Sequence, residues 1–221
     1  VLLRSDGRAV ACGDNGFGQC DIPELESGVF YVQVSAGTCH TALLRSDGRV
    51  VTCGRNLFGQ CDIPQPEEGV VYTQVSAGRG RTALLRSDGR AMAFGYNGAG
   101  QCCIPKLEDG LAYSQVSAGG CHTVLLRSDG RAVACGDDRS GQCDLPKAEE
   151  GVAYVQVSAG RCHTVLLRSD GRAVGCGDNE SGQCDLPEPG EGVVYAQVAA
   201  GGYHTILLRS DGRVVACGHN E

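Results

Sequence analysis

Fourteen cysteines are the residues of this chain with the most obvious capacity for chemistry. Thirteen of them fall in three sets whose members are spaced by multiples of 41 residues, and Cys103 stands alone. The sets are Cys12, Cys53, Cys135, Cys176 and Cys217; Cys20, Cys61, Cys102, Cys143 and Cys184; and Cys39, Cys121 and Cys162. Thiols in such numbers could form disulfides, bind a soft metal ion or act as nucleophiles.

Two interpretations of these thiols stay open, a disulfide framework and a set of reduced side chains. Cys12 and Cys20 occupy neighbouring segments, so the first two sets could pair. Phe94, however, replaces the first set's cysteine in one repeat while Cys102 remains, which leaves an odd sulfur. A chain of this length also needs no covalent staples. We favour buried, reduced thiols that pack as small hydrophobic groups, and hence a reducing intracellular compartment.

Histidines follow the third cysteine position, and histidines can serve as metal ligands or catalytic bases. Arg81 takes the place of histidine in one repeat. Cys39 and His40 are adjacent on an expected strand, where neighbouring side chains point to opposite faces and do not converge on one ion. A residue copied in nearly every repeat is explained more simply by the repeat than by catalysis. We therefore predict no metal, no cofactor and no catalytic centre. We expect these histidines to tie a loop to the neighbouring backbone by a hydrogen bond.

The spacing of these residues reflects an internal repeat of 41 residues. The heptad LLRSDGR begins at residues 2, 43, 84, 125, 166 and 207, with no insertion or deletion between copies. Residues 206–221 realign on residues 1–16, so the chain holds five full repeats and a 16-residue partial repeat. Repeats of this length occur in solenoids and propellers, whose units bury their apolar faces against one another. We predict one domain over residues 1–221, which forms part of a longer chain.

Each repeat carries the signals of four short strands. In the repeat that contains the second copy of the heptad, we expect strands at about 30–36, 40–46, 49–53 and 60–63. Asp47 and Gly48 separate two of these runs and predict a two-residue type I′ hairpin, which needs positive φ at both positions. Pro64 closes the fourth run and suits an edge strand. Four antiparallel strands every 41 residues predict an all-β propeller made of four-stranded blades.

The residues from Gln33 to Gln60 resemble the regulator of chromosome condensation repeat. The shared pattern is QVSAG-xx-H-T-x-LL-x-x-DG-x-V-x-x-x-G-x-N-x-x-GQ, and it recurs along the whole chain. The short period and the segment from Gln60 to Val70 are most similar to the beta-lactamase inhibitor protein II branch of that superfamily. That branch has Trp where this chain has Cys or Phe94 before the Gly of the third strand. The resemblance implies a ring of seven blades; a six-bladed ring and an open arc, which exposes two edges, are the alternatives.

Charge and composition narrow the kind of partner. The formal net charge is -7, whereas nucleic-acid binders are strongly basic on the face that contacts the nucleic acid. No apolar run approaches the ~18 residues needed to span a bilayer. The chain has no Trp, the chromophore that an ultraviolet-sensing member of the superfamily requires. We predict a protein partner or larger assembly, with no nucleic acid and no membrane span.

The heptad itself is interpreted as scaffold. Its two arginines flank SDG in every copy, so their charge belongs to the hairpin and not to one partner. Arg45, Asp47 and Arg49 can pair locally or with acidic loops such as PQPEE, and each exposed pair contributes only ~0–1 kcal/mol. We therefore expect a tight turn, two core-facing leucines and a solvated ring of charge.

The repeats differ from one another mainly in two loops. The loop after the first strand reads TC, RG, GC, RC and GY, and the loop after the third strand reads DNGF, RNLF, YNGA, DDRS, DNES and HNE. In a propeller blade both loops emerge on one face, opposite the uniform hairpins. Aromatic and arginine side chains carry most of the affinity in protein interfaces. The predicted partner-binding residues are Phe17, Arg55, Phe58, Arg79, Tyr96, Arg139, Arg161 and Tyr203.

These observations predict a non-catalytic protein-binding or scaffold propeller that presents the variable loops to a macromolecular partner. The alternative is a regulatory domain of a larger nucleotide-exchange or ubiquitin-ligase protein, which the resemblance also allows. Inhibition of a beta-lactamase is a minor form of the binding hypothesis. The inhibitor's aromatic-rich face is matched only in part, by Phe17, Phe58, Tyr96 and Tyr203.

Overall fold

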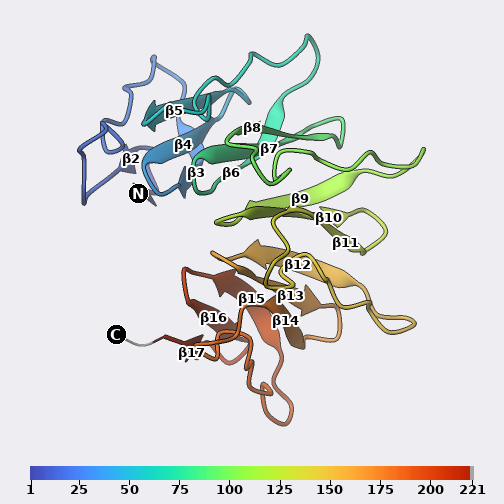
Figure 1. Cartoon of the computed structure of the whole chain (residues 1–221). Helices are drawn as coiled ribbons and strands as arrows, with labels where there is room; N and C mark the ends of the chain where they lie inside the picture. The colour runs from blue at the N-terminus through green and yellow to red at the C-terminus, as the bar shows by residue number, and fades with distance from the viewer. Residues whose placement is uncertain (220–221) are drawn as a thin grey trace.

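The computed structural model describes residues 1–219, and strands are the only regular elements in that range. A two-stranded hairpin, β1 (Leu2–Leu3) and β2 (Ala9–Val10), comes first. Five three-stranded antiparallel sheets follow, which we call blades 1 to 5. Figure 1 shows them one after another around an arc, with both chain ends on the same side of the molecule. No helix in residues 1–219 is long and apolar enough to cross a membrane.

Each blade is built from the same three strands in chain order, with the second strand in the centre. The first strands are β3 (Tyr31–Ala36), β6 (Tyr72–Ala77), β9 (Tyr113–Ala118), β12 (Tyr154–Ala159) and β15 (Tyr195–Ala200). The second strands are β4 (His40–Arg45), β7 (Arg81–Arg86), β10 (His122–Arg127), β13 (His163–Arg168) and β16 (His204–Arg209). The third strands are β5 (Val50–Gly54), β8 (Ala91–Gly95), β11 (Ala132–Gly136), β14 (Ala173–Gly177) and β17 (Val214–Gly218).

The expected fourth strand at 60–63 is a turn in the structure, so the blades described here have three strands. Gly59 has a positive φ of 79°, and its carbonyl accepts a hydrogen bond from the Asp62 backbone at 3.2 Å. The Ile63 amide bonds back to the Cys61 carbonyl at 2.9 Å. The backbone groups that a fourth strand would offer to a ladder are therefore used within the turn.

The hairpin at Asp47 and Gly48 exists, but its predicted type was wrong. Arg45 and Arg49 are joined by a backbone hydrogen bond of 2.8 Å, so the loop has three residues, from Ser46 to Gly48. Gly48 has a φ of 75°, and within residues 1–219 no residue other than glycine has a positive φ. A type I′ turn needs positive φ at both central residues. Asp47 does not adopt it; instead its carboxylate accepts hydrogen bonds from the Arg49 amide at 3.2 Å and from Arg45.

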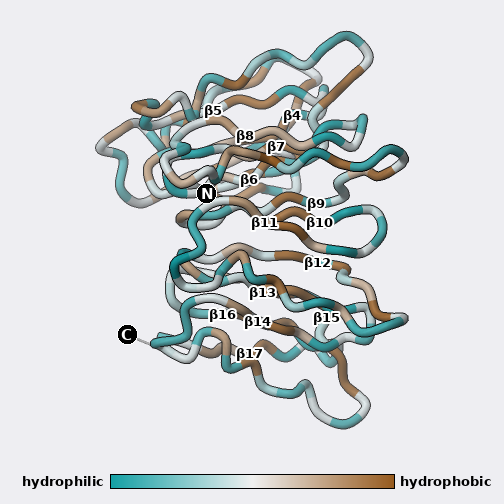
Figure 2. The backbone as a smooth tube through the Cα atoms, turned by 45° about the vertical axis from the view of Figure 1, so that its right-hand side comes forward, coloured by the Kyte–Doolittle hydropathy of each residue, from teal (hydrophilic) through white to brown (hydrophobic). Residues whose placement is uncertain are grey.

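The core lies between adjacent blades. Ala42, Leu44 and Val50 of blade 1 form one buried cluster with Val75 and other residues of blade 2. Leu43 and Leu44 are successive residues of one strand and point to opposite faces, yet both are almost completely buried. The central strand is thus covered on both sides, and each such leucine contributes about 1.5–3 kcal/mol. Figure 2 shows hydrophobic residues along the strands, while the loops contain both hydrophilic and hydrophobic stretches.

Side-chain hydrogen bonds also join neighbouring blades. The Ser35 hydroxyl of blade 1 accepts from the Ala77 amide of blade 2 at 2.9 Å, and the Gln33 side chain accepts from the Val75 amide at the same distance. Equivalent bonds recur up to blade 5. In blade 5 the serine position holds Ala199. A methyl group accepts no hydrogen bond, so this blade lacks the acceptor that blades 1 to 4 share.

The two ends of the arc expose side chains that are buried elsewhere. Leu2 of the N-terminal hairpin is 67% exposed, whereas Leu43, its equivalent one repeat later, is 0% exposed. At the other end Val214 of blade 5 is 63% exposed, against 7% for Val50 in blade 1. The difference arises because these residues have a neighbouring blade on one side only.

Candidate protein-binding face

The two variable loops of each blade lie together. The Arg55 amide, directly after β5, donates to the carbonyl of Cys39 in the loop after β3 at 2.8 Å, and Tyr96 and Gly80 make the same contact in blade 2 at 2.9 Å. Gly54 permits this approach because a Cβ there would lie 2.6 Å from the Cys39 carbonyl oxygen. We call the surface formed by these loops the variable face.

Side-chain amides hold the second of these loops in place. The Asn56 side chain donates to Asp62 at 2.7 Å and accepts from the Cys61 amide at 2.8 Å. The Gln60 side chain accepts from the Phe58 amide at 2.9 Å, and Gln60 is buried. The loop that presents Phe58 is therefore fixed by hydrogen bonds from within the loop and the turn after it.

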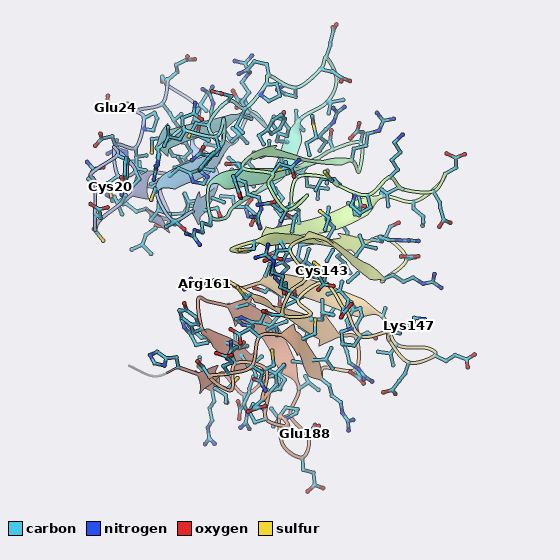
Figure 3. All side chains as sticks on the ribbon, viewed as in Figure 1. Cys20, Glu24, Cys143, Lys147, Arg161 and Glu188 are labelled. Carbon is cyan, nitrogen blue, oxygen red and sulfur yellow. The ribbon has the colours of Figure 1, made fainter. Side chains whose placement is uncertain are left out.

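A groove runs over blades 1 to 3 on the variable face. It has a volume of about 680 Å³ and contains five of the eight residues predicted for partner binding, which are Arg55, Phe58, Arg79, Tyr96 and Arg139. Phe17, Arg161 and Tyr203 lie outside its lining. Figure 3 shows Arg161 on the side of the arc that carries both chain ends, while Lys147 and Glu188 lie on loops that project away from it.

Two aromatic side chains from neighbouring blades meet in the groove. The ring centroids of Phe58 and Tyr96 are 5.0 Å apart and the rings are tilted by 60°. Both rings remain about half exposed, at 51% and 46%. Gly80 lies beside them, where a Cβ would be 3.2 Å from the Phe58 ring. The pair forms an exposed aromatic platform in a preferred tilted geometry.

Two arginines of the face stack on aromatic rings. The guanidinium carbon of Arg55 lies 4.9 Å from the Phe17 ring centroid, and that of Arg161 lies 4.8 Å from the Tyr203 ring centroid. Each contact joins loops of adjacent repeats and is worth about 0.5–1 kcal/mol at an exposed site. Phe17 and Tyr203, which lie outside the groove, therefore hold arginines of the same face.

The arginines of the variable face differ electrostatically from those of the hairpins. Arg45, like its equivalents in the other blades, pairs with the aspartate two residues later, here Asp47 at 2.6 Å. Some of these arginines also reach the acidic loops, as expected; Arg168 and Glu149 are 3.0 Å apart. Among residues 1–219, no carboxylate pairs with Arg55, Arg79 or Arg161.

Beneath the face, the histidines of blades 1, 3 and 4 each contact a threonine hydroxyl of the next blade. His40 also interacts with the backbone of Arg81, in line with the predicted bond to neighbouring backbone. His40 Nε2 lies 2.9 Å from Thr82 Oγ1, and His122 Nε2 lies 2.8 Å from Thr164 Oγ1. The hydroxyl reaches the ring because the threonine directly follows the histidine position in the next blade. Burial lowers the pKa of His40 to about 4 and that of His122 to about 3. These histidines are therefore neutral at physiological pH.

Arg81, whose burial was missed at the level of sequence, replaces the histidine in blade 2. Its side chain is 0% exposed, and Nε donates to Thr123 Oγ1 at 3.1 Å. The guanidinium also donates to the carbonyls of Gly119, Gly120 and His122. Burial lowers the pKa of Arg81. The sequence signal for this burial was the position of Arg81, which histidine occupies in the other four blades.

All fourteen cysteines are free thiols in the structure. They were expected to be buried; instead Cys12 and Cys103 are exposed and the others are half-buried. Cys53, Cys135, Cys176 and Cys217 lie on the third strand, which is an edge strand of its sheet. Burial still raises the pKa of Cys143 and Cys176 to about 12, which disfavours the reactive thiolate. Within residues 1–219 no three or more His, Cys, Asp or Glu side chains gather as a metal site.

The repeated sheets and the shared loop face define a β-propeller. Residues 31–60, 72–101, 113–142, 154–183 and 195–221 match the model of the Regulator of chromosome condensation (RCC1) repeat. These segments make up more than half of the chain, and the chain belongs to the RCC1 repeat family. The resemblance to the regulator of chromosome condensation repeat that was found in the sequence is thereby confirmed. No curated protein sequence is similar enough to the chain to give a match.

Solved structures share the fold at low sequence identity. Prp20p from Saccharomyces cerevisiae is 21% identical, with a TM-score of 0.74 over 87% of this chain and 58% of Prp20p. Human WBSCR16 is 22% identical, with a TM-score of 0.74 over 88% of this chain and 63% of WBSCR16. The CRINKLY WD40 ectodomain of the receptor kinase ACR4 from Arabidopsis thaliana is 21% identical, with a TM-score of 0.69 over 86% of this chain and 69% of that domain.

The chain spans less than two thirds of Prp20p and of WBSCR16. Prp20p is described with its binding properties to Gsp1p and histones, and yeast RCC1 (Prp20) has been solved bound to Kap60. At these identities the likeness concerns the fold.

Proposed function

We propose that this chain is a non-catalytic protein-binding propeller that receives a macromolecular partner on its variable face. The observation that carries the proposal is the groove in which Arg55, Phe58, Arg79, Tyr96 and Arg139 meet. Exposed aromatic and arginine side chains gathered in one concave surface have the composition of an interface centre. Structural neighbours that bind proteins, such as yeast RCC1 (Prp20) with Kap60, support this class of function.

The opposite face offers less for specific recognition. Its hairpins carry the same residues in every blade, and the first arginine of each is neutralised by the following aspartate, as Arg127 is by Asp129 at 2.8 Å. A partner that distinguishes one blade from the next needs sequence differences between the blades, and the aromatic and arginine differences lie in the variable loops. Within the proposal, Phe17 and Tyr203 contribute by orienting Arg55 and Arg161.

Site-specific photo-crosslinking tests this proposal. A photoreactive amino acid replaces Leu57, which is 66% exposed beside Phe58, and in a matched variant it replaces Arg90, whose side chain is 78% exposed at a hairpin. Both variants are irradiated in extracts of the cells that produce the chain. We expect a protein adduct of defined mass at position 57 and none at position 90. An adduct at position 90 with position 57 silent contradicts the assignment.

We also propose that the arc belongs to a closed ring of seven blades in a longer chain. Support comes from Leu2 and Val214, which are exposed at the two ends although their equivalents are buried. A copy of residues 17–82 appended after residue 221 continues the repeat in register and completes seven periods, whereas a copy of residues 17–41 completes six. We expect the seven-period chain to unfold at the highest temperature and to bind least of an apolar dye. A higher melting temperature for the six-period chain contradicts the proposal.

A further inference from the structure

The unpaired arginines of the groove carry an inference about the chemistry of the partner. We propose that the groove over blades 1 to 3 binds an acidic segment of a protein, with side-chain carboxylates accepting hydrogen bonds from Arg55 and Arg79 and an apolar residue resting on Phe58 and Tyr96. This inference rests on the proposed function and specifies the partner's chemistry. It concerns the groove alone and not the opposite face, which carries the SDG hairpins.

Charge in the groove is the first support. Arg55 and Arg79 line it without a carboxylate partner in the described part of the chain, although the chain has 26 acidic residues. Arg139 pairs with Asp137 at 3.4 Å, but its own side chain is 91% exposed, so it stays accessible to a second carboxylate. Positive charges left without a counter-ion in a concave surface attract and orient an anionic ligand.

The geometry of Arg55 is the second support. Its Nε atom is buried and has no hydrogen-bond partner, and its guanidinium is held over the Phe17 ring at 4.9 Å. A buried donor without an acceptor costs about 1–3 kcal/mol. A carboxylate is the planar acceptor that matches the paired donors of a guanidinium. The site is therefore preformed for an acceptor that the chain itself does not supply.

Arg79 extends the same positive region toward the centre of the arc. It lines the groove and also a shallow depression formed by the turns after the first strands, where Arg161 is the other cation. Around these two arginines the depression is lined by alanine, glycine and threonine residues, including Gly119, Gly120 and Gly202. Without bulky side chains in this region, an extended segment can approach the backbone closely.

The acidic residues near the groove favour a peptide over a nucleic acid as the ligand. Asp137 lines the groove, Asp62 lies in the turn after Phe58, and the whole chain has a net charge of -7. A continuous run of phosphates is repelled by such a surface. Carboxylates separated by apolar residues instead place single charges on single arginines, and they leave the apolar residues for the Phe58 and Tyr96 rings.

Binding of defined probes tests the inference. The probes are a short fluorescent peptide in which Asp alternates with Leu and Tyr, the same peptide with Asn for Asp, the same with Lys for Asp, and a single-stranded oligodeoxynucleotide. We expect the Asp peptide to bind and to shift the NMR signals of Arg55 Nε–H and Arg79 Nε–H. Its affinity should fall as salt is added. The Asn and Lys peptides are expected to bind at least about tenfold more weakly.

Matched variants locate the interaction. We expect Arg55→Gln and Arg79→Gln each to weaken binding of the Asp peptide by about tenfold. Arg90→Gln, which removes an exposed charge from a hairpin, should leave the affinity unchanged. Loss of affinity in all three variants alike, tighter binding of the oligonucleotide, or no binding of the Asp peptide at about 1 mM overturns the inference. If the crosslink at position 57 persists in any of these cases, the proposed function stands and only the acidic character of the partner is wrong.

Discussion

Arg81 Nε donates to Thr123 Oγ1 across the interface of blades 2 and 3, and it occupies the position from which a histidine ring reaches the threonine of the next blade elsewhere. The threonine at this position of a blade therefore contacts either a histidine or an arginine of the preceding blade. Arg81 adds three carbonyl acceptors, on Gly119, Gly120 and His122. The arginine is therefore accommodated by backbone oxygens and not by a carboxylate.

We predict that Arg81→His is tolerated and that Arg81→Ala is not. Histidine keeps the contact with Thr123 and removes a buried charge, so the free energy of unfolding should stay within about 1 kcal/mol of the original or rise. Alanine removes the hydrogen bonds that Arg81 donates to Thr123 and to three carbonyls, and it creates a cavity, which together cost about 3–5 kcal/mol. Urea unfolding measures both values. An Arg81→His loss as large as that of Arg81→Ala contradicts this account.

Acidification should destabilise the protein before its carboxylates titrate. The pKa values of His40 and His122 fall from 6.5 to about 4 and about 3 on folding, so the unfolded chain binds more protons between these limits. Stability is fully present above pH 6.5 and is lost as the pH falls toward 4, by up to about 1.4 kcal/mol per pH unit and per histidine. Urea midpoints between pH 7.5 and 4.5 measure the slope. A His40→Gln variant should show a shallower slope; an unchanged slope contradicts the assignment.

Substitutions at Gly48 and Gly69 can test the close contact between the hairpin and Val71, because the two glycines have similar backbone conformations but different surroundings. Both have positive φ, 75° and 78°, but a Cβ on Gly48 would lie 2.4 Å from Val71 Cβ whereas one on Gly69 meets nothing within 4 Å. Gly69→Ala should cost about 1 kcal/mol through backbone strain alone, and Gly48→Ala clearly more because of the added clash. Thermal or urea unfolding measures the difference. Equal costs indicate that Val71 moves freely.

The aromatic platform should matter for the partner more than for the fold. We expect Phe58→Ala and Tyr96→Ala each to weaken a partner bound on the variable face by more than about 1 kcal/mol. Substitution of Arg45 or Arg86, whose charges are paired at the hairpins, should change binding little. Calorimetric titration gives both affinities, and circular dichroism checks that the variants are folded. A larger effect of the hairpin variants assigns the interface to the other face.

The thiols should react according to their exposure. In the native protein we expect Cys12 and Cys103 to react first with an aromatic disulfide reagent, because they are the two exposed thiols. Cys143 and Cys176 should react last, since burial raises their pKa to about 12. After unfolding, all fourteen thiols should be titrated. A lower count in the unfolded, unreduced protein indicates disulfides.

Much of the architecture followed from periodicity. The 41-residue step and the alternating apolar runs predicted β-strands in equivalent positions, and blades 1 to 5 contain the first three of the predicted four. The fourth predicted strand is a turn instead, because the segment after Gly59 satisfies its backbone groups locally, through turns and the side chains of Asn56 and Gln60. Propensity alone does not reveal such side-chain competition for backbone groups.

The candidate site was predicted in composition but not in arrangement. Comparison of the repeats selected Phe58 and Tyr96 separately, and the structure brings their rings into contact. The stacking of Arg55 on Phe17 could not be foreseen, because it depends on how two loops of adjacent repeats approach each other. Burial of Arg81 was missed for a related reason, since charge normally indicates exposure and only the three-dimensional supply of carbonyl acceptors reverses that expectation.

The alanine at position 199 makes the interface on that side of blade 5 weaker than the others in the array. Each earlier blade holds the next with a serine hydroxyl, as Ser158 holds the Ala200 amide at 2.9 Å, and Ala199 offers no such acceptor to a blade stacked upon it in the same way. The missing bond is worth about 1 kcal/mol. Repeat arrays separate where nearest-neighbour coupling is weakest. Under tension, or during proteolysis of a larger assembly, a propeller built on this chain should therefore open after blade 5 before it opens between any of the blades described here.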